Sequence, residues 1–300
     1  LAARYWEARC RSAGAGQAPR GAIYLNIAEH WLEYPEYFDW LGSRPDVEAI
    51  FFVHDLLPLD YPEYFRPGYE AIFRRRLETL ARRGTGFIVS THVVRRRLQS
   101  ALAAMGRQSV PIHVAPLPSP LALSGDDADE TPPPAQRYFV CVSTIEPRKN
   151  HLLILNVWRE LAARLGERMP RLVLIGNRGW ENEQVIDMLE RCEPAARHVL
   201  HVTRLSRRAL TGMVRHARAL LMPSFDEGYG LPLVEALSLG TPVIASDIAA
   251  FREVTRGCAT LLSPIDGLAW AEAVAALSRG DGGAAAWRRG RITHTRQERF

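Results

Sequence analysis

Along the second half of the chain, short apolar runs alternate with longer stretches whose apolar residues recur at helical spacing. The short runs are typical of buried strands, and the longer stretches are typical of amphipathic helices. Strands are predicted at residues 138–143, 171–175, 198–202, 220–223 and 242–246. Helices are predicted between them at residues 151–165, 183–192, 207–217 and 232–239. This alternation forms β-α-β units with a parallel sheet, so we expect a doubly wound, Rossmann-like α/β domain.

The first half of the chain shows a shorter version of the same pattern. Strands are predicted at residues 22–27, 49–53, 86–90 and 110–115, and helices at residues 69–82 and 93–105. This half is similar to part of a second doubly wound domain that lacks its first units. We therefore expect a first Rossmann-like domain that is incomplete at its N-terminus.

A proline-rich acidic stretch separates the two halves. Residues 116–136 contain six prolines and an acidic run, and three consecutive prolines cannot continue a helix or a central strand. We expect a first domain at 1–118, a linker at 119–136 and a second domain at 137–300.

Composition excludes several classes of protein. The chain has 300 residues, 47% of them hydrophobic and 24% charged, as is usual for a soluble globular protein. No run approaches the roughly 18–20 apolar residues of a membrane span. The four cysteines lie far apart without a C-x-x-C pair, which disfavours a disulfide framework or a zinc site and favours a cytoplasmic protein.

Charge is distributed unevenly within a net charge of +5. Residues 1–65 have five arginines and ten acids, whereas residues 66–118 have ten arginines and two acids. Residues 66–107 could therefore contact an anionic membrane surface, placing the protein peripherally on the inner face of the plasma membrane, or they could be solvated helix faces. Interleaved aromatic residues are few, so no nucleic-acid partner is expected. Lys149 is the single lysine of the chain.

The strongest candidate for chemistry is the loop at residues 223–231, between a predicted strand and a predicted helix. Gly228 and Gly230 allow a sharp turn and a close approach to a ligand. The free N–H groups at the helix start favour an anion such as a diphosphate. Glu227 and Glu235 would repel phosphate, so they suit hydrogen bonds from sugar hydroxyls. Taken singly, each could also be a solvated loop acid or a carboxylate favoured by the helix dipole.

A second candidate is the turn at residues 143–150, at the same predicted edge of the sheet. Arg148 offers a planar guanidinium and Lys149 a compact cation, and both suit a diphosphate. The alternative is an ordinary charged turn.

These residues carry a resemblance that extends from Ala22 to about Leu277. The segment from Glu227 to Glu235 resembles the E-x7-E motif of the retaining glycosyltransferases with the GT-B fold. The turn Glu-Pro-Arg-Lys-Asn at 146–150 and the segments 174–180, 240–247 and 52–58 also match that family. The last of these is most similar to bacterial enzymes, often mannosyltransferases, that build surface polysaccharides. The resemblance implies two Rossmann-like domains that face a cleft, with residues 1–118 as the acceptor-side domain and residues 137–300 as the donor-binding domain.

The resemblance also implies roles at the matching positions. Glu227 would contact hydroxyls of the donor sugar, Lys149 with Arg148 would neutralise the departing diphosphate, and His54 would project from the first domain toward the reacting sugar. For His54, a strand-end histidine bonded to backbone is the alternative. Glu235 would hold the ribose hydroxyls. The remaining expected donor-binding residues are Thr144, Gly176, Arg204, Leu205, Gly228, Tyr229, Gly230 and Leu231. Ser143 and Thr144 stand where the family often has a Gly-Arg pair.

The function implied is transfer of a hexose, with mannose as a candidate, from a GDP- or UDP-sugar to a lipid-linked or polysaccharide acceptor with retention of configuration. No cofactor is expected, because Arg148 and Lys149 would carry the charge that a metal would otherwise balance. Asp127 and Asp129 resemble the metal-binding D-x-D of another glycosyltransferase fold, but they fall in the predicted linker. Two alternatives stay open. One is a truncated or inactive GT-B subunit that binds nucleotide or a partner transferase, and the other is a nucleotide-sugar epimerase or phosphorylase of the same fold.

Overall fold

The computed structural model describes residues 18–119 and 137–279. The chain divides into two compact units, Leu1–Pro116 (unit 1) and Leu117–Phe300 (unit 2), and each is described by itself. Most of the predicted linker, including Asp127 and Asp129, lies outside the described residues.

Unit 1 contains a parallel sheet whose strands pair in chain order. Its strands are β1 (Ile23–Asn26), β2 (Glu48–Val53), β3 (Gly86–Val89) and β4 (Ile112–Val114). The predicted strands are thus present, although β1 and β4 are shorter than the apolar runs that indicated them. Parallel neighbours need a crossover, and the helical segments between the strands supply it.

The helical segments of unit 1 lie between its strands along the chain. They are η2 (Pro35–Ser43), α2 (Leu57–Asp60), η3 (Pro62–Tyr64), α3 (Tyr69–Arg83) and α4 (His92–Ala104). Phe51 and Phe87 of the sheet are buried in one core with Phe73 of α3 and Leu98 of α4. Helix α4 begins at His92 because the Thr91 side chain caps it by accepting the Val94 N–H at 3.1 Å.

Unit 2 contains a six-stranded parallel sheet in the order β10-β9-β8-β5-β6-β7. The strands are β5 (Tyr138–Val142), β6 (Arg171–Ile175), β7 (Val199–Val202), β8 (Leu220–Met222), β9 (Val243–Ser246) and β10 (Thr260–Leu262). The chain moves outward from β5 to β7, returns to the middle at β8, and moves outward again to β10. The expected doubly wound fold is confirmed. The order reverses between β5 and β8, and this switch point is where such sheets bind ligands.

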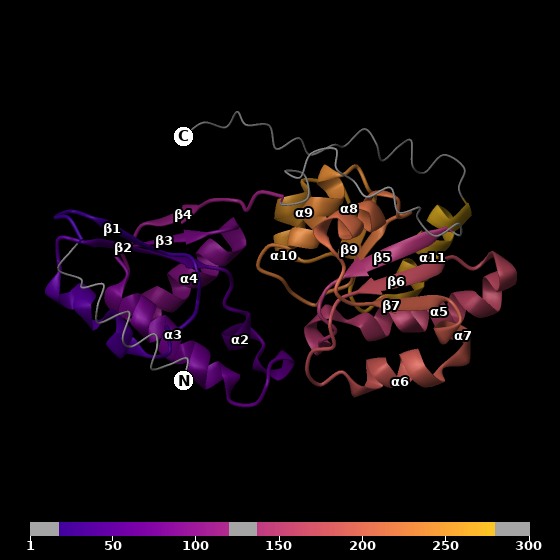
Figure 1. The fold of residues 1–300 in the computed structure, drawn as a ribbon, viewed down its shortest axis with the longest axis horizontal. Helices are drawn as coiled ribbons and strands as arrows, with labels where there is room; N and C mark the ends of the chain where they lie inside the picture. Colours follow the sequence, from indigo (N-terminus) through magenta and orange to yellow (C-terminus); the bar gives the residue numbers. More distant parts are fainter. Residues whose placement is uncertain (1–17, 120–136, 280–300) are drawn as a thin grey trace. The chain divides into compact units, whose positions relative to one another are not determined.

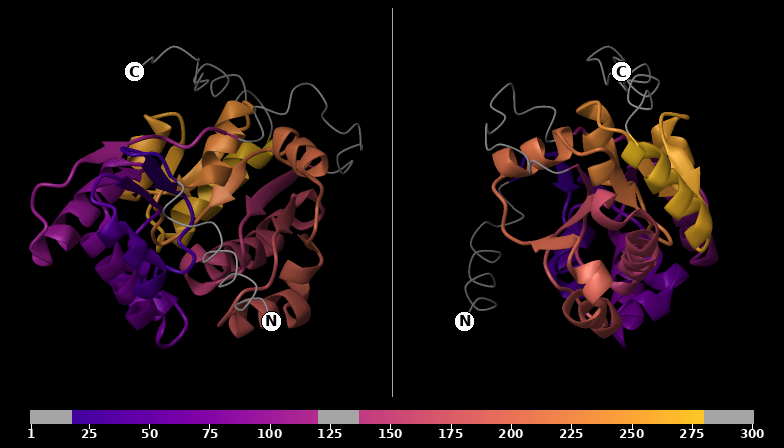
Figure 2. Two further views of the ribbon diagram at one scale, coloured as in Figure 1. Left: turned by 60° about the vertical axis from the view of Figure 1, so that its left-hand side comes forward. Right: turned by 90° about the vertical axis from the view of Figure 1, so that its right-hand side faces the viewer.

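Helices cover both faces of this sheet (Figures 1 and 2). Unit 2 has α5 (His151–Leu165), α6 (Glu183–Arg191), α7 (Glu193–Ala196), α8 (Arg207–Arg215), α9 (Leu231–Ser238), α10 (Ala249–Thr255) and α11 (Gly267–Arg279), with short turns η5 (Pro147–Lys149) and η6 (Gly166–Arg168). Trp158 of α5 and Trp270 of α11 are fully buried on one face. Leu233 of α9 and Phe251 of α10 are fully buried on the other. Apolar residues on both faces of the strands explain why their sequences read as continuous apolar runs.

Within the two described ranges, none of the helices is both long enough and apolar enough to span a bilayer.

Candidate functional site

The loops that follow β5 and β8 meet at the switch point of unit 2. The two strands pair through Val140 and Leu220, so their carboxyl ends are neighbours. The Phe225 N–H donates to the Arg148 carbonyl at 2.9 Å, and the Asn150 side chain donates to the Pro223 carbonyl at 3.1 Å. Asn150 has a left-handed backbone with φ of 55°, which lets the chain turn from η5 into α5. The two predicted candidate loops therefore form one site.

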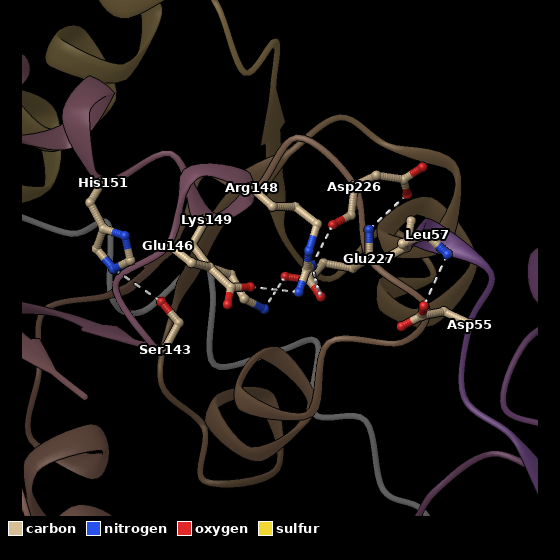
Figure 3. A network of polar contacts seen from close by, with 9 residues as sticks. All are labelled: Asp55, Leu57, Ser143, Glu146, Arg148, Lys149, His151, Asp226 and Glu227. Carbon is tan, nitrogen blue, oxygen red and sulfur yellow. Dashed lines mark hydrogen bonds and ion pairs between the residues drawn. The ribbon is translucent and has the colours of Figure 1, made fainter. Parts of the chain in front are cut away.

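Glu227 is the centre of a compact ionic cluster in this site (Figure 3). Its Oε1 accepts from Lys149 Nζ at 2.6 Å, and its Oε2 lies 2.8 Å from Arg148 Nη1. Burial by itself would raise the pKa of Glu227, but Lys149, Arg148 and the Ser224 hydroxyl outweigh it and lower the pKa to about 2. Glu227 is therefore a carboxylate at neutral pH, held among cations in a site from which water is largely excluded.

Arg148 differs from Lys149 in how many partners hold it. Its Nη1 donates to the Asp226 carbonyl at 2.8 Å, and its Nη2 donates to Glu146 Oε1 at 2.9 Å. Burial raises the pKa of Glu146, although Arg148 and Lys149 oppose this effect. The planar guanidinium thus joins both loops, and the geometry suits a fixed structural cation more than a mobile one.

The turn into α9 brings backbone close to the site. Gly230 has φ of 94°, and a Cβ there would lie 2.6 Å from the Phe251 ring, so the position requires glycine on two counts. Gly228 and Tyr229 are buried beside it, and the Tyr229 hydroxyl donates to the Leu117 carbonyl at 2.8 Å. Leu231 is half-buried at the start of α9.

Glu235, one turn into α9, has no ion pair or hydrogen-bonded partner among the described residues. It is half-buried, and this burial raises its pKa to about 7 although Arg207 opposes the shift. A half-buried carboxyl without a partner is a good acceptor for the hydroxyls of a ligand.

Gly176 is the residue that follows β6, the strand on the side of β5 away from β8. Its φ is 154°, and a Cβ at this position would lie 2.0 Å from the Ser143 carbonyl oxygen. The Gly176 carbonyl lies 2.8 Å from His201 Nε2 of β7. The sequence-predicted glycine is therefore required for the close packing of two strand ends.

The other predicted site residues lie in loops that follow strands of the two units. Thr144 is exposed in the loop after β5, Arg204 is exposed with φ of 58° after β7, and Leu205 is half-buried beside it. His54 belongs to unit 1, where it is exposed after β2 with its ring 4.7 Å from the Phe52 ring. Burial and Asp55 raise the pKa of the nearby Glu29 carboxyl, and the His54 ring and backbone N–H oppose this effect.

Sequence reasoning missed two polar groups at this site. Glu146 holds Arg148, and His151, the first residue of α5, bonds Ser143. A glutamate beside two cations and a histidine at a helix start were visible in the sequence, but nothing there indicated that both side chains are buried.

Among residues 18–119 and 137–279, no group of three or more His, Cys, Asp or Glu side chains is arranged to hold a metal ion.

Comparison with known proteins decides the family. The family model described as "Glycosyl transferases group 1" matches residues 126–288. The chain belongs to this family. The match includes the loops after β5 and β8, so the ionic cluster lies within the part that defines the family.

Curated relatives of this group 1 glycosyltransferase include mannosyltransferases. The serotype-specific mannosyltransferase WbdA of Escherichia coli is 30% identical over 223 residues, which are 69% of this chain and 27% of that protein. The O-antigen chain mannosyltransferase B of Escherichia coli is 33% identical over 131 residues, 44% of this chain and 34% of that protein. The chain thus spans about a quarter to a third of the length of these relatives.

Solved structures support the fold. An α,α-trehalose-phosphate synthase (UDP-forming) from Burkholderia vietnamiensis matches with a TM-score of 0.68 at 14% identity, over 93% of this chain and 75% of that one. TarM matches with a TM-score of 0.63 at 15% identity, over 90% of this chain and 51% of that one. These likenesses confirm the expected α/β fold of the GT-B type.

Proposed function

We propose that this group 1 glycosyltransferase moves a hexose, with mannose as the first candidate, from a nucleoside diphosphate sugar to a lipid-linked or polysaccharide acceptor with retention of configuration. The observation that carries the proposal is the Lys149–Glu227 pair at the switch point of the unit 2 sheet. The names of the mannosyltransferase relatives support mannose as the sugar.

The diphosphate of the donor is proposed to bind at Lys149. Among the described residues, the Lys149 ammonium contacts only Glu227, at 2.6 Å, so its remaining N–H donors can bind a phosphate oxygen while the pair with Glu227 is kept. Arg148 supports it from a fixed position, since two carboxylates and a backbone carbonyl already hold its guanidinium. The backbone of Gly228, Tyr229, Gly230 and Leu231 adds N–H groups at the start of α9.

The sugar and the nucleoside are proposed to bind the two carboxylates of the loop and helix. Glu227, ionised at neutral pH, accepts hydrogen bonds from donor sugar hydroxyls, and Glu235 accepts those of the ribose. Gly176, Arg204, Leu205 and Thr144 line the path of the nucleotide along the carboxyl edge of β5, β6 and β7.

The reaction breaks the bond between the anomeric carbon and a diphosphate oxygen, and the electron pair leaves with the diphosphate. The acceptor oxygen bonds the same face of the anomeric carbon and passes its proton to the departing phosphate oxygen. Negative charge grows on the diphosphate as the bond breaks, and a preorganised cation such as Lys149 stabilises it. We propose that His54 contributes from unit 1 by contacting the reacting sugar, and that no metal ion is needed.

The protein is also proposed to work at the inner face of the plasma membrane. The arginines of unit 1 supply the positive charge that would attract anionic lipid. Some of them are already paired with carboxylates: Arg76 with Glu33, Arg83 with Asp39 and Arg97 with Asp60. On α3 and α4, the exposed arginines that no described carboxylate pairs are Arg75, Arg82, Arg95 and Arg96. These four arginines are called the basic face below. They are a smaller set than the arginines of residues 66–107, which the sequence indicated.

The proposal is tested by a donor screen on the purified protein with lipid and polysaccharide extracts as acceptors. Release of nucleoside diphosphate is measured from GDP-, UDP-, ADP- and dTDP-sugars, and the product linkage is assigned by NMR. Turnover with a GDP- or UDP-hexose supports the proposal if the new glycosidic bond has the same anomeric configuration as the donor sugar. Absence of release with every donor overturns the transferase assignment, and an inverted product overturns retention.

A further inference from the structure

Ser143 and His151 form a hydrogen-bonded pair next to the ionic cluster (Figure 3). Ser143 is the first residue after β5, and His151 is the first residue of α5, so the whole 143–150 loop lies between them. His151 Nε2 is 3.1 Å from Ser143 Oγ. His151 is 2% exposed, whereas Ser143 is half-buried at the carboxyl edge of the sheet.

The surroundings of His151 fix the direction of this hydrogen bond. Its Nδ1 is buried and has no hydrogen-bond partner within residues 18–119 and 137–279. A buried N–H without an acceptor is rarer and costlier than an acceptor without a donor, so Nδ1 carries the lone pair and Nε2 carries the hydrogen. Burial, assisted by the charges of Lys149 and His201, lowers the pKa of His151 to about 4, which keeps the ring neutral. His151 Nε2–H therefore donates to Ser143 Oγ.

This arrangement leaves the Ser143 hydroxyl hydrogen to serve another acceptor. The Ser143 hydroxyl can also donate to the buried Cys141 thiol, which lowers the pKa of that thiol, but burial outweighs this and raises the pKa to about 12. The thiol is therefore neutral, and a neutral thiol is a weak acceptor. Ser143 is fixed in place, since its N–H donates to the Ile175 carbonyl at 3.0 Å and its own carbonyl oxygen packs against Gly176. The strongest acceptor that the site can receive is an anion held by Lys149 on the same loop.

We propose that Ser143 donates a hydrogen bond to the diphosphate of the donor and that His151 is a positioning residue that directs the Ser143 hydroxyl toward it. The inference rests on the proposed function and adds a neutral donor to the cations already assigned there.

The test measures dissociation constants of GDP and UDP by calorimetry for the wild type and for Ser143→Ala, His151→Leu, His151→Gln and the Ser143→Ala/His151→Leu double variant. A hydrogen bond to a charged group is worth roughly a 10-fold change in affinity, so Ser143→Ala and His151→Leu should each weaken binding about 10-fold. The double variant should be no weaker than either single one. His151→Gln should restore affinity, because its amide N–H can replace Nε2–H.

Each outcome has one meaning. Wild-type affinity in Ser143→Ala, additive losses in the double variant, or no recovery in a folded His151→Gln overturns the inference. Ser143 is only half-buried and its alanine variant removes a single oxygen atom, so this variant decides the matter even where a His151 variant does not fold. Failure of the wild type to bind any nucleoside diphosphate overturns the proposed function instead, which separates the two failures.

Discussion

Lys149 and Glu227, which are 78 residues apart in sequence, meet at 2.6 Å across the switch point of the unit 2 sheet. Their side chains are 15% and 9% exposed, so the pair is shielded from water and from salt. In the proposed function, the cation of this pair binds the phosphates of the donor and the carboxylate accepts its sugar hydroxyls.

Replacing Lys149 tests the cation. Lys149→Ala should lower kcat at least about 10²-fold, because growing charge on the diphosphate loses its mobile cation. Arg191→Ala is the control, since Arg191 pairs with Asp187 on an exposed helix surface and should leave the rate unchanged. The single lysine allows a second readout: a lysine-directed acylating reagent has one side chain to label, and nucleoside diphosphate should protect it. Unprotected labelling with a normal kcat in Lys149→Ala would contradict the assignment.

Glu227 should govern acid stability. Its pKa is lowered from 4.5 to about 2 in the fold, so its contribution to the free energy of unfolding is complete above pH 4.5 and is lost as the pH falls toward 2. Glu227→Gln leaves Arg148 and Lys149 buried without this partner and should destabilise the protein by about 3 kcal/mol at pH 7, with a smaller loss at pH 3.

Denaturant unfolding at both pH values measures this difference. The matched control is Glu193→Gln, which removes a carboxylate from an exposed ion pair with Arg197 and should change the unfolding free energy by less than about 0.5 kcal/mol. An equal loss at both pH values would show that Glu227 is not ionised in the native state.

Glu235 should make donor binding pH-dependent near neutrality. Burial raises its pKa to about 7, so half of the molecules have a protonated carboxyl at that pH in the absence of ligand. Ribose hydroxyls donate better to the carboxylate, so the dissociation constant for GDP or UDP should rise as the pH falls from 8 to 6. Glu235→Gln should weaken binding and flatten this dependence. A pH profile that is unchanged in the variant would remove Glu235 from the nucleoside site.

Gly176 should tolerate no side chain. A Cβ would lie 2.0 Å from the Ser143 carbonyl at a φ of 154°, so Gly176→Ala must displace the backbone at two strand ends, at a cost of about 3 kcal/mol or more. Gly267→Ala is the control, because a Cβ there meets nothing closer than Leu153 Cδ1 at 3.6 Å. Thermal unfolding should show a lower Tm for the first variant and little change for the second. Equal Tm values would argue against this packing.

The basic face should bind anionic lipid. Replacing Arg82, Arg95 and Arg96 with serine should reduce flotation with vesicles that contain phosphatidylglycerol, and salt should reduce wild-type flotation, since Coulomb attraction is screened within about 10 Å at 0.1 M salt. The control removes three exposed arginines of unit 2, Arg159, Arg164 and Arg191. Equal losses in both triple variants would show that total charge, and not this face, determines binding.

Much of the fold could be predicted because buried parallel strands are encoded locally. All five strands predicted in unit 2 occur, since each is an apolar run bounded by turn residues. The region after residue 246 was left without predicted elements, yet it forms α10, β10 and α11. Strand β10 has three half-buried residues, too few to give a periodic signal. The 3₁₀ segment η2 was missed because its apolar residues lack the spacing of an α-helix.

The site was predictable in its residue types but less so in its contacts. Glycines, cations and carboxylates at strand ends indicated a ligand loop, yet no sequence signal shows that Arg148 is held by both Glu146 and Glu227. Such pairings depend on how two loops from distant parts of the chain meet. The neutral state of His151 likewise depends on burial that α5 acquires when it packs on the sheet.

A crystal structure of the protein with bound nucleoside diphosphate tests the central claim most directly. The account predicts the diphosphate at the switch point between β5 and β8, with a phosphate oxygen within hydrogen-bond distance of Lys149 Nζ and the ribose hydroxyls on the Glu235 carboxylate. A nucleotide bound elsewhere on the protein, with the Lys149–Glu227 pair unchanged and remote from phosphate, would contradict it.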